Sequence, residues 1–326
     1  MDKLVSVVMS TYKTKKEFLD ESIKSILTQT YSNIEFIIIC DGSIDDYNYI
    51  QNKYTDNRIR LIFHKENQGL PKSLNEGITI ARGEYIARMD SDDIAIDDRL
   101  QSQVSYMERN NDVEMCGMYA KCFGSENRKA RVFFTKPEEL EILSLYYPVF
   151  IHPTVMFRKS FFNKGIYYNE NYLCSQDMEL WTKSACHNNM AIVKKYGLCY
   201  RIHENQAGIA KRKQQLYYVS LIREMAAKKM EGLPQEQIIK VLEMLYGEVE
   251  TNERGFCEVY NAIDIIIKNS HNFNPQTMKR VFYQRMFVLL CKYKLFGICF
   301  KPRYFTKIFN ATNMKYLFWR LQGGLR

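Results

Sequence analysis

Short apolar runs alternate with helical periodicities along the first third of this 326-residue chain. The apolar runs occupy residues 4–9 and 34–40, two further strand-like segments occupy 59–63 and 84–89, and each of the four stops at a polar residue. Such runs are typical of parallel strands that are buried on both faces. Apolar side chains recur at helical spacing over residues 19–27 and 72–81, which predicts intervening helices. This order of elements predicts an α/β fold with a mostly parallel central sheet flanked by helices.

The pattern changes twice farther along the chain. Between residues 112 and 207 we expect a strand at 113–117, a helix at 137–147, an extended segment at 151–157 and a helix that opens at Asp177. From about residue 209 helices dominate. Asn274-Pro275 predicts the cap and first turn of a helix that runs to about Phe296 and ends at Gly297. We therefore expect an α/β domain at 1–207 and a C-terminal helical region at 208–326.

The composition excludes several classes of protein. Hydrophobic residues make up 46% of the chain and charged residues 25%, which is globular and excludes a disordered or collagenous chain. No signal peptide is visible at the start. The most apolar stretch, residues 281–300, contains three cations, which argues against a membrane-spanning helix. Nine cysteines without a C-x-x-C pair fit reduced thiols in the cytosol.

The positive charge is concentrated at the C-terminal end. The formal net charge is +9, yet residues 1–264 contain 34 basic and 37 acidic side chains. Residues 265–326 contain 12 Lys or Arg, no carboxylate and 13 aromatic residues. This combination suits peripheral attachment to an anionic membrane, nucleic-acid binding, or a helical unit that packs its aromatic rings inward.

Acidic and polar clusters lie where the predicted strands end, which is where open α/β sheets bind ligands. Asp90-Ser91-Asp92-Asp93 offers the oxygen ligands that Mg²⁺ or Mn²⁺ prefers. The alternative is a solvated acidic turn, or capping of a helix over 94–110. Asp41, in Asp41-Gly42, is suited to accept a hydrogen bond from a base or ribose, although Asp-Gly is also common in ordinary turns.

Two further positions offer acid–base or metal chemistry. Asp177 begins a predicted helix and is a candidate general base, because a carboxylate can remove the proton of an attacking hydroxyl. A carboxylate at this place is also a common helix cap. His203, in Tyr200-Arg201-Ile202-His203, is a candidate metal or phosphate contact, with a packed or surface histidine as the alternative.

Taken together, these motifs resemble the inverting family 2 glycosyltransferases, which have the nucleotide-diphospho-sugar transferase (GT-A) fold. The resemblance covers roughly residues 3–205 and is closest to the subgroup that builds bacterial surface polysaccharides, such as amylovoran and O-antigen hexosyltransferases. The matching segments, in order, are Val5-Ser6-Val7-Val8-Met9-Ser10-Thr11-Tyr12, the helix and turn from Ser22 to Glu35, Asn67-Gln68-Gly69-Leu70, Gly83 to Leu100, His152-Pro153-Thr154-Val155-Met156 and Tyr200-Arg201-Ile202-His203.

The resemblance implies a role for each matching residue. Thr11 and Tyr12 would lie beside the base and ribose, Asp41 would bind uracil, and Asp90 would lie near the ribose and sugar. Asp92 would bind the metal, with His203 as a further candidate ligand, and Asp177 would be the catalytic base. On the acceptor side or in supporting positions we expect His152, Gln176 and Trp181. Two departures stand out, since the family usually has Asp at the position of Cys40 and Glu at that of Gln176.

The resemblance also implies an activity and a place. We expect metal-dependent transfer, with inversion, of one hexose or N-acetylhexosamine from a UDP-sugar such as UDP-galactose. The acceptor would be a polyprenyl-diphosphate-linked glycan of capsule, O-antigen or exopolysaccharide synthesis. Such acceptors lie at the inner face of the cytoplasmic membrane, which favours peripheral attachment there and no nucleic-acid partner. The alternatives are a catalytically silent partner that binds sugar nucleotide, and a nucleotidyltransferase, which Ser10-Thr11-Tyr12-Lys13-Thr14 disfavours because it lacks glycine.

Overall fold

The structure is a computed structural model that describes residues 2–186, 189–203, 212–247, 249, 251–295, 310 and 312–316. The strands are β1 (Val5–Thr11), β2 (Ile34–Asp41), β3 (Ile59–His64), β4 (Tyr85–Asp90), β5 (Ile94–Ala95), β6 (Val113–Gly124), β7 (Arg128–Ala130), β8 (Met156–Arg158) and β9 (Asn189–Ile202). The helices of the α/β part are α1 (Lys16–Leu27), α2 (Ile44–Lys53), α3 (Leu70–Ile80), α4 (Arg99–Arg109), α5 (Pro137–Ser144), α6 (Lys159–Phe162) and α7 (Gln176–Ser184), with a 3₁₀ turn at His152–Thr154. The helices that follow are α9 (Arg212–Ala227), α10 (Gln235–Tyr246), α11 (Glu253–Asn269) and α12 (Pro275–Lys292).

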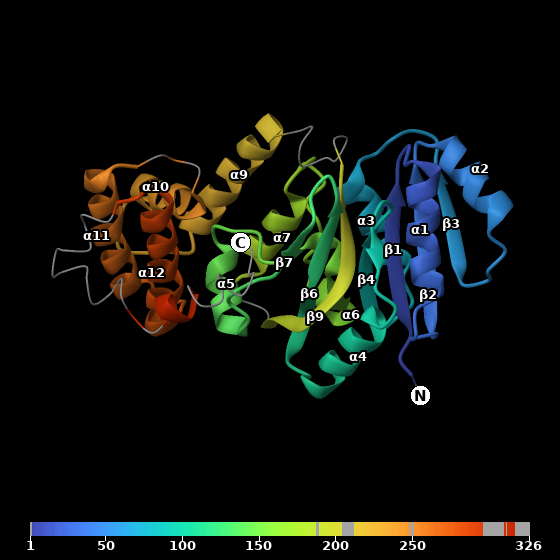
Figure 1. Cartoon of the computed structure of the whole chain (residues 1–326), viewed down its shortest axis with the longest axis horizontal. Helices are drawn as coiled ribbons and strands as arrows, with labels where there is room; N and C mark the ends of the chain where they lie inside the picture. Colours follow the sequence, from blue (N-terminus) through green and yellow to red (C-terminus); the bar gives the residue numbers. More distant parts are fainter. Residues whose placement is uncertain are drawn as a thin grey trace.

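One sheet forms the centre of the molecule (Figure 1), with the strand order β3-β2-β1-β4-β8-β6-β9-β5 and β7 paired to β6. β3, β2, β1 and β4 run parallel, as do β6 and β9, while β8, β5 and β7 pair antiparallel to their neighbours. The predicted α/β fold with a mostly parallel sheet is therefore confirmed. The register places Thr11 opposite Cys40 and Ser10 opposite Asp90, so the polar ends of three strands meet at one edge.

Alternate residues of the central strands feed two separate cores. Val7 and Met9 of β1 pack with α1 and α4, whereas Val8 packs on the opposite face with α3. Because successive side chains of a strand point to opposite faces, a sheet covered on both sides needs apolar residues at every position. This requirement explains the uninterrupted apolar runs of the sequence.

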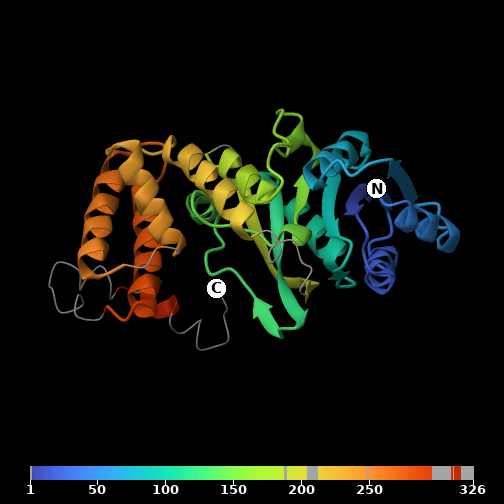
Figure 2. The ribbon, with the colours of Figure 1, turned by 90° about the horizontal axis from the view of Figure 1, so that it is seen from above.

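The C-terminal helices continue one of these cores. Buried residues of α10, α11 and α12 belong to the same cluster as Val8, and Figure 2 shows these helices as a block at the end of the molecule opposite β1–β3. Phe282 and Phe287 of α12 are buried, so the described part of the basic segment packs its aromatic rings inward. Most of the remaining residues of that segment, 296–309 and 317–326, lie outside the described residues. Among the residues described, no helix combines the length and hydropathy needed to cross a bilayer.

Several elements differ from those expected. The segment 151–157 is not extended throughout, because a 3₁₀ turn at His152–Thr154 precedes the short strand β8. The strand expected at 113–117 continues to Gly124 along β9. The side chain of Asn274 caps α12 as predicted, but the helix ends at Lys292, and Gly297 lies outside the described residues.

Candidate active site

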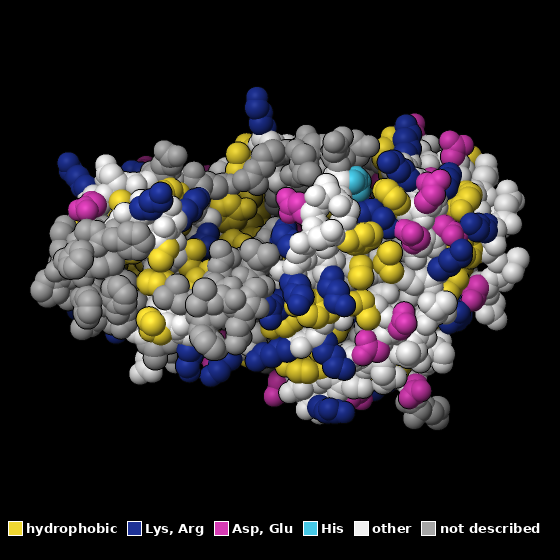
Figure 3. Space-filling model, in the orientation of Figure 1, with side chains coloured by type: hydrophobic (Ala, Val, Ile, Leu, Met, Phe, Trp, Pro, Cys, Tyr) yellow, Lys and Arg dark blue, Asp and Glu magenta, His cyan; other side chains and the backbone are white. Residues whose placement is uncertain are grey.

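A cavity of about 850 Å³ opens at the edge where the parallel strands end. It reaches from the ends of β1, β2 and β4, past the start of α7, to α12. Figure 3 shows a hollow with an apolar floor between the helical region and the sheet. Several residues predicted for the site line this cavity: Tyr12, Asp41, Asp90, Asp92, His152, Gln176, Asp177 and His203.

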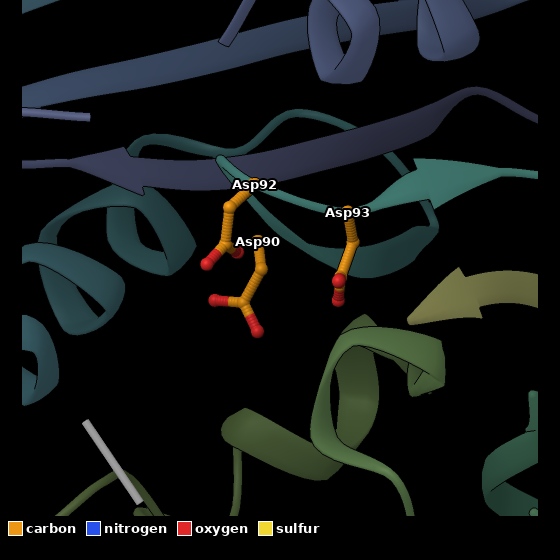
Figure 4. Close-up of side chains that lie close together, drawn as sticks. All are labelled: Asp90, Asp92 and Asp93. Carbon is orange, nitrogen blue, oxygen red and sulfur yellow. The ribbon is translucent and has the colours of Figure 1, made fainter. Parts of the chain in front are cut away.

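Three carboxylates gather where β4 ends (Figure 4). Asp90, Asp92 and Asp93 each offer an oxygen atom, and these atoms lie within 4.8 Å of one another. Asp93 is only 1% exposed. Burial, and then the charges of Asp90 and Asp92, raise its pKa well above the ordinary value. The cluster is therefore electrostatically unfavourable without a cation.

The same cluster fits a hard divalent metal. Asp93 Oδ1 accepts a hydrogen bond from the backbone N–H of Arg201 at 2.7 Å, while Asp93 Oδ2 is buried without a hydrogen-bond partner among the described residues. Asp92 Oδ2 lies 2.9 Å from His203 Nε2. Clustered carboxylate oxygens are the donors that Mg²⁺ and Mn²⁺ prefer. The helix α4 begins only at Arg99, so Asp92 and Asp93 do not serve as its cap.

Arg88 supplies the positive charge beneath the cluster. Its side chain is 4% exposed, lines the cavity and forms an ion pair with Asp90. Its Nη1 atom is the one that pairs with Asp90 Oδ1, while its Nε atom is buried without a hydrogen-bond partner among the described residues. Burial raises the pKa of Asp90, and the charge of Arg88 opposes that rise. Since Arg88 lines the cavity, its positive charge is suited to interact with a bound anionic substrate.

Asp177 faces the same cavity from the first turn of α7. Ser175, the residue before the helix, has a φ of 59°, and this left-handed conformation turns the chain into α7. Burial raises the pKa of Asp177, whereas backbone N–H groups at the helix start and the charge of Arg88 lower it. A carboxylate with a raised pKa is a stronger base, which suits a general base.

The protein is similar to known glycosyltransferases in sequence. The family model described as "Glycosyl transferase family 2" matches residues 6–166. An uncharacterized glycosyltransferase of Methanocaldococcus jannaschii is 34% identical over 233 residues, which are 67% of this chain and 78% of that protein. The chain belongs to glycosyl transferase family 2.

Two further comparisons extend the family assignment. The putative glycosyltransferase EpsE of Bacillus subtilis is 36% identical over 185 residues, 55% of this chain and 66% of EpsE. The crystal structure of S. aureus TarS 1–349 in complex with UDP-GlcNAc superposes with a TM-score of 0.61 at 17% identity, covering 98% of this chain and 92% of that one. At this identity the likeness concerns the fold, which is GT-A as the sequence predicted.

Asp41 of the family 2 glycosyltransferase is held rigidly at the end of β2. Its carboxylate is 2% exposed and accepts hydrogen bonds from the backbone N–H groups of Gln68 and Gly69, at 2.8 and 2.9 Å. His64 Nδ1 lies 2.9 Å from Asp41 Oδ1, and His64 Nε2 lies 2.6 Å from Glu76 Oε2. Sequence reasoning missed His64, since no local pattern links it to a residue 23 positions away.

Thr11, the last residue of β1, and Tyr12, which follows it, are the two residues predicted to lie beside the nucleotide, and their surroundings differ. Tyr12 is 47% exposed and lines the cavity. Thr11 is buried, does not line the cavity, and donates its hydroxyl hydrogen bond to Asp46 Oδ2 at 2.9 Å. The expected contact of Thr11 with the nucleotide is therefore not available to its side chain, which instead fixes the loop after β1.

The three supporting residues occupy different positions. Gln176 is buried on the cavity wall beside Asp177. His152 Nε2 lies 2.7 Å from the Tyr168 hydroxyl, and burial and the charge of Arg88 lower its pKa well below the ordinary value, so it is neutral. Trp181 is fully buried and does not line the cavity, and its ring centroid lies 6.1 Å from that of His152. Trp181 therefore supports the wall from behind and makes no acceptor contact.

Proposed function

We propose that this family 2 glycosyltransferase transfers one sugar from a UDP-sugar to a hydroxyl group of a glycan acceptor, with inversion at the anomeric carbon. The observation that supports the proposal is that the carboxylate cluster and Asp177 line one cavity. Binding of UDP-GlcNAc by TarS, whose fold is similar, supports a UDP-sugar as donor. A hexose or N-acetylhexosamine fits this chemistry.

The residues divide the chemistry between them. Asp92, with Asp90 and Asp93, would hold Mg²⁺ or Mn²⁺, which as a Lewis acid stabilises the charge of the departing diphosphate. Asp177 accepts the proton of the acceptor hydroxyl as that oxygen bonds to the anomeric carbon. The bond from the anomeric carbon to the diphosphate oxygen breaks at the same time, and UDP leaves as an anion. Arg88 fixes Asp90 beneath the reacting sugar.

The test replaces the base without changing its shape. Asp177→Asn should lower transfer by a factor of about 10²–10⁴, the usual contribution of a general base, and should keep donor binding. Glu179→Gln is the matched control, because it removes a carboxylate from the same helix but away from the cavity wall. Transfer at the wild-type rate by Asp177→Asn would exclude Asp177 as the base.

Metal dependence is tested separately. We expect EDTA to abolish transfer, and Asp92→Asn to remove the stabilisation by UDP that depends on Mn²⁺ or Mg²⁺ in a thermal-shift assay. Equal activity with and without EDTA would disprove the metal proposal. Donor hydrolysis in the presence of metal also distinguishes an enzyme from a catalytically silent partner, which would bind UDP without cleaving the donor.

We also propose that the acceptor is a polyprenyl-diphosphate-linked glycan of a bacterial surface polysaccharide, reached at the inner face of the cytoplasmic membrane. Support comes from the sequence of the basic segment, where residues 296–326 contain five Lys or Arg besides Lys315, and seven aromatic residues besides Tyr316. Each such cation near an anionic surface contributes about 1 kcal/mol. Flotation with anionic liposomes, but not with neutral ones, is the expected result, and no flotation with either would refute the attachment.

A further inference from the structure

The end of β9 holds the carboxylate cluster from one side. The short strand β5 pairs antiparallel with β9, with Ile94 opposite Cys199. The same pairing direction brings Arg201 beside Asp92 and Asp93, and Figure 4 shows the end of β9 approaching Asp93. The cluster therefore depends on contacts with a residue 108 positions after Asp93 in the sequence.

Arg201 makes two hydrogen bonds to the segment that carries the cluster. Its backbone N–H donates to Asp93 Oδ1, and its side-chain Nε donates to the backbone carbonyl of Asp92, each at 2.7 Å. The first bond fixes one oxygen atom of a buried carboxylate. The second fixes the backbone from which the Asp92 side chain reaches the cavity. One arginine thus restrains two of the three carboxylate residues.

The Arg201 guanidinium is itself held on several sides. Its Cζ atom lies 4.0 Å from the ring centroid of Phe18 and 4.5 Å from that of Phe123. Its Nη2 atom forms an ion pair with Glu21, and the Arg201 side chain is only 11% exposed. A planar guanidinium can stack on rings while it donates hydrogen bonds in its plane, which a lysine ammonium cannot do. These contacts join α1 and β6 to the cluster through one side chain.

Arg201 and Arg88 differ in their relation to the cavity. Arg88 lines the cavity, and Arg201 does not. The side chain of Arg201 instead contacts Asp92 through the backbone and Glu21 through an ion pair. Any effect of Arg201 on a bound ligand must therefore pass through the residues that it holds.

We propose that Arg201 is a positioning residue that fixes the separation and direction of Asp92 and Asp93 for a divalent cation. Like charges repel one another, so carboxylates this close together need a restraint when no cation is bound. This inference rests on the proposed function, which assigns Mg²⁺ or Mn²⁺ to the cluster. Replacing a residue that holds metal ligands from behind typically lowers metal affinity by about 10–100-fold.

A role in positioning and a role as a mere charge predict opposite results. A positive charge near the site repels a metal cation, so a neutral replacement of Arg201 would tighten metal binding if only charge mattered. If Arg201 positions the carboxylates, the same replacement weakens binding. Arg201→Lys separates the two roles further, because lysine keeps the charge but has neither the planar group that stacks between two rings nor the Nε donor.

The experiment measures Mn²⁺ binding directly. Mn²⁺ is titrated into the UDP-loaded full chain, free Mn²⁺ is followed by electron paramagnetic resonance, and the spectrum of bound Mn²⁺ reports its ligand geometry. We expect Arg201→Met and Arg201→Lys each to raise the Kd of Mn²⁺ about tenfold or more and to change that spectrum. Lys194→Met is the matched control, since Lys194 is an exposed cation on the same strand and off the cavity wall. Its Kd and spectrum should match those of the wild type.

Glu21→Gln tests the same idea without disturbing the buried contacts. This variant removes only the outer anchor of the guanidinium, and the Glu21 side chain is 51% exposed, so we expect the chain to fold normally. The Kd of Mn²⁺ should rise by about two- to fivefold, the range of an exposed ion pair. If both Arg201 variants fail to fold, Glu21→Gln decides, and an unchanged Kd there would overturn the inference.

The outcomes separate this inference from the proposed function. If the UDP-loaded wild type binds no Mn²⁺, the metal part of the proposed function fails and the inference fails with it. If the wild type binds Mn²⁺, yet folded Arg201→Met or Arg201→Lys binds it as tightly or more tightly, only the positioning role is wrong.

Discussion

His64, at the end of β3, holds Asp41 in a buried contact. The imidazole is buried between the carboxylates of Asp41 and Glu76, with nitrogen–oxygen distances of 2.9 and 2.6 Å. Burial lowers the pKa of His64, but its hydrogen bonds to the two carboxylates raise the pKa by more. The net effect is a pKa above the ordinary value of 6.5. We therefore expect His64→Leu to leave a buried carboxylate without its cation.

The cost of that substitution follows from the contacts that remain. Removing one partner of a buried ion pair costs about 3–5 kcal/mol. Asp41 keeps the N–H groups of Gln68 and Gly69, so we expect about 3 kcal/mol, near the lower limit. Glu76→Gln is the control, because the Glu76 side chain is 40% exposed and an exposed pair contributes only about 0–1 kcal/mol.

The pH dependence gives a second, independent check. A group whose pKa is raised on folding contributes its full stability below its unfolded pKa and loses it as pH rises through the folded pKa. The difference in unfolding free energy between wild type and His64→Leu should therefore be largest below pH 6.5 and shrink at higher pH. Urea unfolding measured from pH 5.5 to 9 tests this. A difference below 1 kcal/mol, or one that is constant across the range, would refute the paired imidazolium.

Four further outcomes are expected. Gly42→Ala should weaken stabilisation by UDP in a thermal-shift assay, because Gly42 has φ +77° and a Cβ there would lie 2.3 Å from a backbone nitrogen; unchanged stabilisation would contradict this. Asn274→Ala should lower the urea-unfolding free energy by about 1 kcal/mol through loss of the helix cap. Cys40 and Cys116, whose burial raises each pKa to about 12, should resist a thiol reagent at pH 8 until the protein unfolds, as mass spectrometry would show. Since burial raises the pKa of Asp177, the acid limb of the transfer rate should lie above pH 3.8, and a limb at or below 3.8 would argue against it.

The sequence predicted the strands and the carboxylate cluster because both depend on local pattern. Apolar runs identify buried parallel strands, and parallel strands bring their carboxyl ends to one edge. The alternation of side chains along a strand would have corrected the prediction that the Thr11 side chain contacts the nucleotide. Alternate residues of a strand point to opposite faces, and Ser10 and Tyr12 line the cavity while Thr11 between them is buried. Arg88 and Asp90 are two positions apart in β4, and both line the cavity for the same reason.

The contacts that the sequence did not reveal join distant segments. His64 and Asp41 meet because β2 and β3 are neighbours in register. Gln284 reaches the cavity only because α12 packs against α5, which no periodicity of either helix specifies. Trp181 was predicted as an acceptor-side or supporting residue, and the face of α7 that carries it packs into the core, which leaves the supporting role. Side-chain direction and helix docking therefore limit what sequence reasoning can assign.

The two departures from the family pattern bear on the choice between an active enzyme and a silent one. Cys40 is fully buried on the face of β2 opposite Asp41. Burial raises the pKa of the Cys40 thiol most, and the charge of Asp46 raises it further. Asp46 already binds Lys16 Nζ at 2.7 Å. A second carboxylate at position 40 would compete for that cation, so a neutral thiol suits the site and leaves Asp41 in place.

Gln176 can be understood in the same way. A glutamate beside Asp177 would raise the basicity of that carboxylate by charge repulsion. Burial already raises the pKa of Asp177 without it, and Gln176 lies on the cavity wall, where its amide can face a polar substrate. A neutral residue there also avoids a further charge near Asp90 and Asp92. Neither departure removes a group that the proposed chemistry uses, so both are compatible with the proposed catalysis.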